Sequence, residues 1–241
     1  IGAAGNTSAD AAAWGYPVFI LSSATPDKWY ALYRGIYLFD TSGLPDDAPI
    51  TAATLSIRGR SLLDQFVPPI NADINVYASA PASDTALVNG DYDSLGAVAF
   101  STAIPYGSIS IVGYNDFILN ASGIAAIDKT GVSKFGARNA NYDVSGNPPA
   151  WQGSKQIQIA AYFTEQGAGF KPMLVVTYTV ETAYNTMVGN PTSWVWEKCD
   201  YGASEQCPVG SELSWAWKAP TSGGPDKTPQ GSPTSFSWGS E

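Results

Sequence analysis

The chain has 241 residues, of which 44% are apolar and 14% are charged, and its formal net charge is −9 at pH 7. The length allows one β-domain with an additional segment, and the apolar content suffices for a sizeable core. The negative charge argues against a nucleic acid as partner, because phosphate binding needs a positive field. The sequence has no histidine, which excludes Ser-His-Asp and Cys-His catalytic systems and removes the commonest transition-metal ligand.

The composition of the chain indicates a compartment. No run of the sequence is long and apolar enough to span a bilayer, so we expect no membrane span. The chain begins with Ile1 instead of Met, which fits a removed signal or propeptide or a trimmed form. Low charge with many Gly, Ser, Thr and Ala residues is typical of extracellular and virion β-proteins. We therefore expect an extracellular or virion-surface location.

The first forty residues predict an arm followed by strands. Residues 1–13 are rich in Gly, Ala, Ser and Asn without periodicity, so we expect an extended N-terminal arm that is ordered only against another surface. Residues 14–21 predict a first strand. Residues 33–40 carry apolar side chains on both faces, which predicts an interior strand covered on both sides.

Further strands are predicted at short intervals as far as residue 180. Residues 50–57, 156–163 and 173–180 show the strongest strand patterns, and helix is predicted over about one turn, from Ser122 as its cap to Ile127. We therefore predict an all-β fold, an antiparallel β-sandwich over residues 14–180. The side chains expected in its core are Ile36, Leu38, Leu55, Ile57, Ile157, Ile159, Leu174 and Val176.

Several of these segments carry the motifs of a known family. The run from Arg34 to Leu55, the strand Tyr114–Asn120 and the closing segment Pro172–Thr179 resemble those of the DNRLRE-type domain, a carbohydrate-binding-module-like β-sandwich. The resemblance covers roughly residues 10–180. It implies a jelly-roll-like sandwich of the kind found on extracellular enzymes, cell-surface proteins and phage virion proteins, and it brings no catalytic residues.

Aromatic side chains in or near the predicted loops are candidates for glycan binding. Carbohydrate-binding modules present coplanar aromatic rings to the faces of sugars. Packing within the core or within a loop is the alternative explanation for each ring. The candidates are Trp29, Tyr30, Tyr92, Tyr142 and Trp151.

Three aspartates in a turn-rich segment suggest a cation site. Asp84, Asp91 and Asp93 could supply oxygen ligands to calcium, which is the one cofactor that the sequence suggests. The alternative is that these residues stabilise turns, because Asp hydrogen-bonds readily to nearby backbone groups. An Asp-x-Asp pair without the rest of a calcium-loop motif does not decide between the two.

Residues 181–241 form a C-terminal extension that is rich in Trp and Pro. It holds five of the eight tryptophans, and we predict that Ser193–Trp196 and Leu213–Trp217 pair as a β-hairpin with its tryptophans on one face. Cys199 and Cys207 are predicted to form a disulfide near the turn of this hairpin, which implies an oxidising location. The side chains expected to make assembly contacts are Trp194, Trp196, Trp215, Trp217, Phe236 and Trp238.

Three classes of function compete for this sequence. A non-catalytic structural or adhesion subunit of an extracellular assembly is favoured, because the terminal extensions call for a partner, either other copies of the chain or a neighbouring structural protein. A carbohydrate-binding module is the alternative. An enzyme is the weakest class, because acidic residues lie mostly in predicted turns and Glu165 is the single one near a glycine-rich loop that invites attention.

Overall fold

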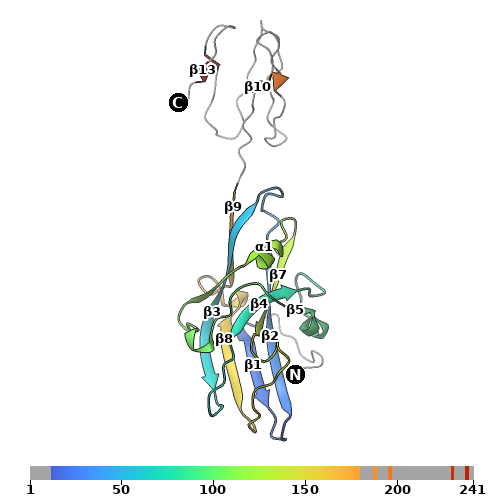
Figure 1. The fold of residues 1–241 in the computed structure, drawn as a ribbon, viewed down its shortest axis with the longest axis vertical. Coiled ribbons are helices and arrows are strands. Elements are labelled where there is room, and N and C mark those ends of the chain that lie inside the picture. The colour runs from blue at the N-terminus through green and yellow to red at the C-terminus, as the bar shows by residue number, and fades with distance from the viewer. Residues whose placement is uncertain (1–11, 180–186, 189–194, 197–228, 231–236, 239–241) are drawn as a thin grey trace. The chain divides into compact units, whose positions relative to one another are not determined.

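The computed structural model describes residues 12–179 and, after them, four two-residue strands at 187–188, 195–196, 229–230 and 237–238 (Figure 1). The chain divides into two units, Ile1–Thr179 and Val180–Glu241, and each is described by itself. Within the described residues, no helix is both long enough and apolar enough to cross a membrane.

Nine antiparallel strands build the first unit. They are β1 (Trp14–Ser22), β2 (Trp29–Asp40), β3 (Ile50–Asp64), β4 (Ile74–Ser79), β5 (Leu95–Ala99), β6 (Tyr114–Ile118), β7 (Val132–Asn139), β8 (Gln156–Tyr162) and β9 (Met173–Tyr178). They form one hydrogen-bonded sheet in the order β5-β4-β7-β2-β1-β8-β3-β6, and β9 pairs with β3 beside this path. The predicted all-β, antiparallel fold is thereby confirmed. The jelly-roll sandwich stays a prediction, because the strands belong to one curled sheet.

Two long strands change partners along their length, and this makes the sheet curl. The first half of β2 pairs with β1 as far as Arg34, and the second half pairs with β7 from Gly35 onward. Strand β3 pairs with β6 and β9 as far as Arg58 and with β8 from Gly59 onward. The sheet therefore bends around a single core cluster. The course of its strands can be followed in the ribbon (Figure 1).

Gly59 marks the point at which β3 changes partners. The carbonyl oxygen of Ser110 approaches so closely that a Cβ on residue 59 would lie 2.0 Å from it. Real side chains do not tolerate that distance, so this position requires glycine. The amide of Gly59 donates to the carbonyl of Gly113 at 3.2 Å, which holds the 110–113 loop against the bend.

Half of the side chains predicted for the core are buried, and the other half are only half-buried. Leu55, Ile57, Ile157 and Ile159 are buried as predicted. The prediction of which β2 side chains turn toward the core was wrong. Tyr37 is buried, whereas Ile36 and Leu38 are half-buried. Because both faces of this strand are apolar, alternation could not decide which face turns toward the core.

Leu174 and Val176 are also less buried than predicted. Both are half-buried, although they pack against the core cluster. The reason is the position of β9, which pairs with β3 along one side. A strand with a neighbour on one side leaves part of each inward side chain open to solvent.

Helix is sparse among the described residues, as predicted, but it begins with a different cap. The helix α1 spans Ala121–Ala125, and the side chain of Asn120 accepts a hydrogen bond from the amide of Gly123 at 3.0 Å. The predicted cap, Ser122, lies inside this helix. Three 3-10 turns accompany it: η1 (Asn89–Ser94), η2 (Tyr106–Ser108) and η3 (Thr164–Gln166).

Two small antiparallel pairs are described in the second unit. Strand β10 (Met187–Val188) pairs with β11 (Val195–Trp196), and β12 (Pro229–Gln230) pairs with β13 (Ser237–Trp238). The described partner of Val195–Trp196 is therefore Met187–Val188 and differs from the predicted one. The predicted partner, Leu213–Trp217, lies outside the described residues.

We predict that Leu55→Ala lowers the free energy of unfolding by about 2–5 kcal/mol, because this side chain is fully buried in the core cluster. Leu38→Ala is the matched control, the same change at a half-buried position, and should cost clearly less. Urea denaturation followed by circular dichroism measures both values. Equal losses would contradict the placement of Tyr37, instead of Leu38, on the core face.

Candidate interaction surfaces

A buried carboxylate is clamped between two arginines where β2 changes partners. Asp143 accepts hydrogen bonds from Arg34 at 2.9 Å (Nε) and 2.7 Å (Nη2), and from Arg138 at 2.9 Å through both Nε and Nη2. Its side chain is 1% exposed, against 9% for each arginine. We call Arg34, Arg138 and Asp143 the Asp143 clamp.

The clamp ties together segments that are far apart in the sequence. Arg34 also donates to the carbonyl of Tyr92 at 2.6 Å, and Arg138 donates to the carbonyl of Gly96 at 2.7 Å. One carboxylate thus links β2, β7, the loop after β7 and the segment from η1 to β5. Each oxygen of Asp143 is saturated by arginine N–H groups, so its role is structural, without a position for a ligand.

The charge state of Asp143 depends on these contacts. Burial alone would raise the pKa of the Asp143 carboxyl group, but the hydrogen bonds from Arg138 and Arg34 outweigh that effect and hold the pKa below its usual range. The folded state therefore binds this proton more weakly than the unfolded chain does. Stability should depend on pH accordingly.

The five predicted glycan-binding aromatics do not form a common platform. Trp29, Tyr92 and Tyr142 pack against the core, and the ring of Trp29 stacks on Phe66 with 6.4 Å between centroids. Trp151 is half-buried and its indole N–H has no partner. No ring contact joins any two of the five, and packing against the core explains three of them, Trp29, Tyr92 and Tyr142.

Tyr30 and Tyr92 differ in their surroundings. Tyr30 is 78% exposed and open to solvent. The ring of Tyr92 lies 4.0 Å from the guanidinium carbon of Arg34, and burial raises the pKa of Tyr92 to about 12. Tyr92 therefore belongs to the surroundings of the Asp143 clamp.

The three calcium candidates have separate partners. Asp84 forms an ion pair with Lys134 at 2.5 Å, and Asp93 lies 3.9 Å from Arg34. Asp91 is buried and accepts hydrogen bonds from the amides of Ala82 and Val88, both at 2.8 Å. Among the described residues, no three His, Cys, Asp or Glu side chains gather as a metal site would need. Asp91 thus stabilises a turn, as the alternative explanation had it.

Sequence reasoning missed an aromatic row on the outer face of β1 and β2. The ring of Phe19 lies 4.8 Å from that of Tyr33, its direct partner across the strands, and 5.3 Å from that of Tyr16. Trp14 contacts Tyr16 edge-on at 5.6 Å, and the guanidinium carbon of Arg60 lies 3.8 Å above the Trp14 ring. We call Trp14, Tyr16, Phe19 and Tyr33 the aromatic row.

The aromatic row could not be found by alternation. The register between β1 and β8 shifts between Gly15 and Val18, where Pro17 lies. This irregularity brings Tyr16 and Phe19, which are three residues apart, into ring contact. A strict period of two would assign them to opposite faces.

A second, aliphatic row crosses β6, β3 and β9. Thr54 of β3 pairs directly with Ile118 on one side and with Val175 on the other, so the three side chains share the outer face. Ile118 is 73% exposed and Val175 is 56% exposed. Met173 is exposed on the same face of β9. We call Ile118, Thr54 and Val175 the aliphatic row.

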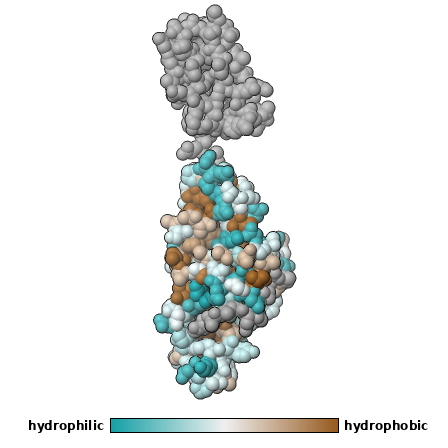
Figure 2. Space-filling view, turned by 90° about the vertical axis from the view of Figure 1, so that its right-hand side faces the viewer, coloured by the Kyte–Doolittle hydropathy of each residue, from teal (hydrophilic) through white to brown (hydrophobic). Residues whose placement is uncertain are grey.

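The view in Figure 2 shows one face of the molecule, where hydrophobic patches are interspersed with hydrophilic residues. Apolar side chains are thus present on this face of the first unit. Single exposed apolar residues are ordinary, whereas a contiguous group of them is a candidate contact surface.

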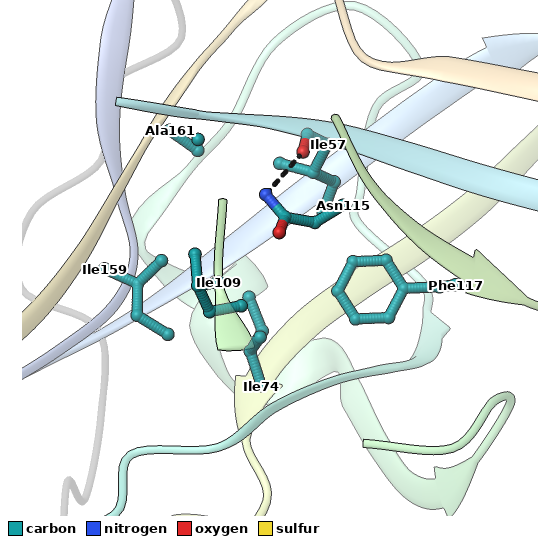
Figure 3. Close-up of a pocket in the computed structure, with 8 residues that line it drawn as sticks. Ile57, Ile74, Ile109, Asn115, Phe117, Ile159 and Ala161 are labelled. Atoms are coloured by element: carbon teal, nitrogen blue, oxygen red, sulfur yellow. Dashed lines mark hydrogen bonds between the residues drawn. The ribbon is translucent and has the colours of Figure 1, made fainter. Parts of the chain in front are cut away.

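A small cavity lies between β3, β4, β6 and β8 (Figure 3). Its volume is about 10 Å³, and Ile57, Ile74, Ile109 and Ile159 are among the side chains that line it. The Asn115 side chain donates to the carbonyl of Ile57 at 3.2 Å at its edge. A cavity of this size is at the lower limit for one water molecule, so it does not accommodate an organic ligand.

Glu165, the acidic residue that drew attention as a catalytic candidate, is exposed in η3. Gly167 and Gly169 follow it with φ of 93° and 81°, so they shape the turn.

The predicted assembly residues lie mostly outside the described part of the chain. Trp196 and Trp238 are described as members of β11 and β13. The assembly contact and the disulfide both stay predictions. The residues outside the described part are Trp194, Trp215, Trp217, Phe236, Cys199 and Cys207.

Comparisons of the chain with protein-family models, with curated proteins and with solved structures give no match. The resemblance to the DNRLRE-type domain stays an expectation based on sequence motifs. Fold and surfaces together define an all-β domain that carries an aromatic row and an aliphatic row on its outer faces.

We predict that the Asp143 clamp makes stability fall in acid. An unfolded aspartate titrates at about 3.9. Because the pKa of Asp143 is lower in the folded state, its contribution is present above that value and is lost as the pH falls toward the folded pKa. Asp143→Asn should lower the free energy of unfolding by about 3–5 kcal/mol at neutral pH, because it leaves buried arginines unpaired.

The control for this experiment is Asp84→Asn, which removes an exposed partner of Lys134 and should cost less than about 1 kcal/mol. Urea denaturation between pH 3 and 7 (about the range in which carboxylates titrate) measures both variants. The Asp143 variant should also show a weaker loss of stability in acid than the parent chain. Identical pH profiles of parent and variant would contradict a stabilising role for the clamp.

Proposed function

We propose that this chain is a non-catalytic structural or adhesion subunit of an extracellular assembly, such as a virion decoration or fibre protein or a surface filament. Its partners are further copies of itself. The contacts involve the aliphatic row of the first unit together with the Trp-rich C-terminal extension. Catalysis is no part of this proposal.

The observation that carries the proposal is the aliphatic row at the margin of the sheet. Ile118 and Val175 flank Thr54 on three adjacent strands and are more than half exposed. The strand β9, Met173–Tyr178, contains no charged side chain. An apolar row beside an uncharged edge strand is the kind of surface that soluble monomers avoid and that assembling subunits cover.

The second candidate function is glycan binding, and the aromatic row favours it. Trp14 and Tyr33 are exposed at 37% and 42% along β1 and β2. Such rings offer apolar faces to a sugar, and Gln158, which pairs with Phe19 from the neighbouring strand, offers an amide for hydroxyl groups. The rings are tilted against each other by 33° to 87°, however, which departs from a coplanar platform.

The assembly proposal predicts that the full chain sediments as species larger than a monomer and that their share rises with concentration. Val175→Lys should shift this equilibrium toward monomer by about tenfold or more, because it places a charge on the contact surface. Val112→Lys is the matched control, the same change at a loop residue that is 80% exposed. A parent chain that stays monomeric at all accessible concentrations would contradict the proposal.

The glycan proposal predicts binding of the full chain to members of a polysaccharide panel. Tyr33→Ala should abolish that binding, because Tyr33 lies in the aromatic row. Tyr30→Ala is the control, since Tyr30 is 78% exposed in the same strand and takes part in no described ring contact. Affinity electrophoresis measures all three proteins. Equal retardation of the two variants, or no retardation of the parent chain, would contradict glycan binding at this row.

A further inference from the structure

The strand β9 has one edge with no partner among the described residues, because it pairs with β3 alone. The backbone of β3 shows which groups of β9 face that open edge. The carbonyl of Ala53 accepts from the amide of Leu119 at 2.9 Å, and the amide of Gly59 donates to the carbonyl of Gly113 at 3.2 Å. Odd-numbered residues of β3 therefore direct their backbone groups toward β6.

The alternation of a regular strand then fixes the orientation of β9. Thr54, an even-numbered residue of β3, directs its backbone groups toward β9, and its partner Val175 directs its own toward β3. The neighbours of Val175 point the other way. The N–H and C=O groups of Leu174 and Val176 therefore face this edge, where no described strand pairs with them.

Three devices that commonly protect an edge strand, charged side chains, proline and a β-bulge, are missing from β9. The strand Met173–Tyr178 contains no charged residue and no proline. The register shift in its pairing with β3, between Ile50 and Ala52, adds a residue to β3, so β9 itself continues without a bulge. A regular, uncharged edge of this kind is a template for a further strand.

We propose that β9 pairs antiparallel with β9 of a second copy of this chain, around a two-fold axis at Val175. This contact specifies the partner in the assembly function proposed above and rests on it. In this register Leu174 lies opposite Val176 of the second copy, and each such pair exchanges two backbone hydrogen bonds. Val175 faces Val175 of the second copy, and Met173 faces Thr177.

The sequence of β9 is self-complementary in this register, which favours a second copy of the chain as the occupant. A two-fold axis places each surface against itself, so the strand has to be self-complementary. On the outer face Val175 meets an identical valine, with Met173 and Thr177 beside it, and no like charges are opposed. On the inner face Leu174 and Val176, which are half-buried in one copy, meet each other and become covered.

The pairing also joins the exposed surfaces of the two copies. The aliphatic row of one copy continues at Val175 into the aliphatic row of the other, so Ile118, Thr54 and Val175 repeat in reverse order across the axis. The result is an apolar stripe of twice the width on one face of a continuous sheet.

Cysteine cross-linking tests both the contact and its register. With Val175→Cys, the two introduced thiols lie opposite each other at a Cα separation of about 4.5–5.5 Å, which is within the range of a disulfide. We expect the full-length variant to form covalent dimers on mild oxidation, seen by non-reducing electrophoresis. Thr177→Cys is the matched control, since its thiol would face Met173 and should give at least about tenfold less dimer. Both variants retain the native Cys199 and Cys207, so background linkage is the same.

Cross-linking at residue 175 but not at 177 supports the proposed pairing. Equal linkage at both positions, or none at residue 175, overturns it. Sedimentation of the parent chain distinguishes a failure of the β9 contact from a failure of the assembly function proposed above. A parent chain that associates while the Val175→Cys variant stays unlinked refutes the β9 contact alone, whereas a parent chain that never associates refutes both.

Discussion

The fold of the first unit depends on one carboxylate, that of Asp143. It receives four hydrogen bonds from Arg34 and Arg138 at 2.7–2.9 Å, and these arginines in turn hold the carbonyls of Tyr92 and Gly96. Arg34 is the last residue of β2 that pairs with β1, and from Gly35 onward β2 pairs with β7. The clamp thus lies at the bend of the sheet and fixes the strands on both sides of it.

The second bend has a steric basis instead of an electrostatic one. Strand β3 leaves β6 and β9 for β8 at Gly59, where the Ser110 carbonyl leaves no room for a side chain. Together the two bends curl a single sheet around one core, and among the described residues no further strand pairs with either end of the sheet. The open side of β9 and the aliphatic row are therefore direct consequences of how β3 divides its length among three neighbours.

Much of the fold could be predicted from sequence, because alternation in segments such as 50–57 and 156–162 reports burial on one face. Sequence could not predict that Tyr37, and not Leu38, turns toward the core, because both faces of β2 are apolar and tertiary packing decides between them. The aromatic row could not be predicted, because the irregularity near Pro17 interrupts the two-residue alternation of β1. The Asp143 clamp escaped because its members are 109 and 5 residues apart, and no local pattern links them.

Among the surfaces, the predicted glycan residues were chosen for lying in or near predicted loops, yet Trp29, Tyr92 and Tyr142 pack against the core. Residue type does not show whether an aromatic ring covers its own core or faces a partner. The aliphatic row became visible once strand pairing placed Ile118 and Val175 on either side of Thr54.

Hydrogen–deuterium exchange of the β9 amides tests most directly the claim that copies of this chain join through that edge. The amides of Leu174 and Val176 should exchange slowly in concentrated solution and rapidly on dilution, because their hydrogen-bond partners belong to the second copy. The amide of Val175, which faces β3, should stay protected at both concentrations. Exchange of Leu174 and Val176 that is independent of concentration would contradict the account.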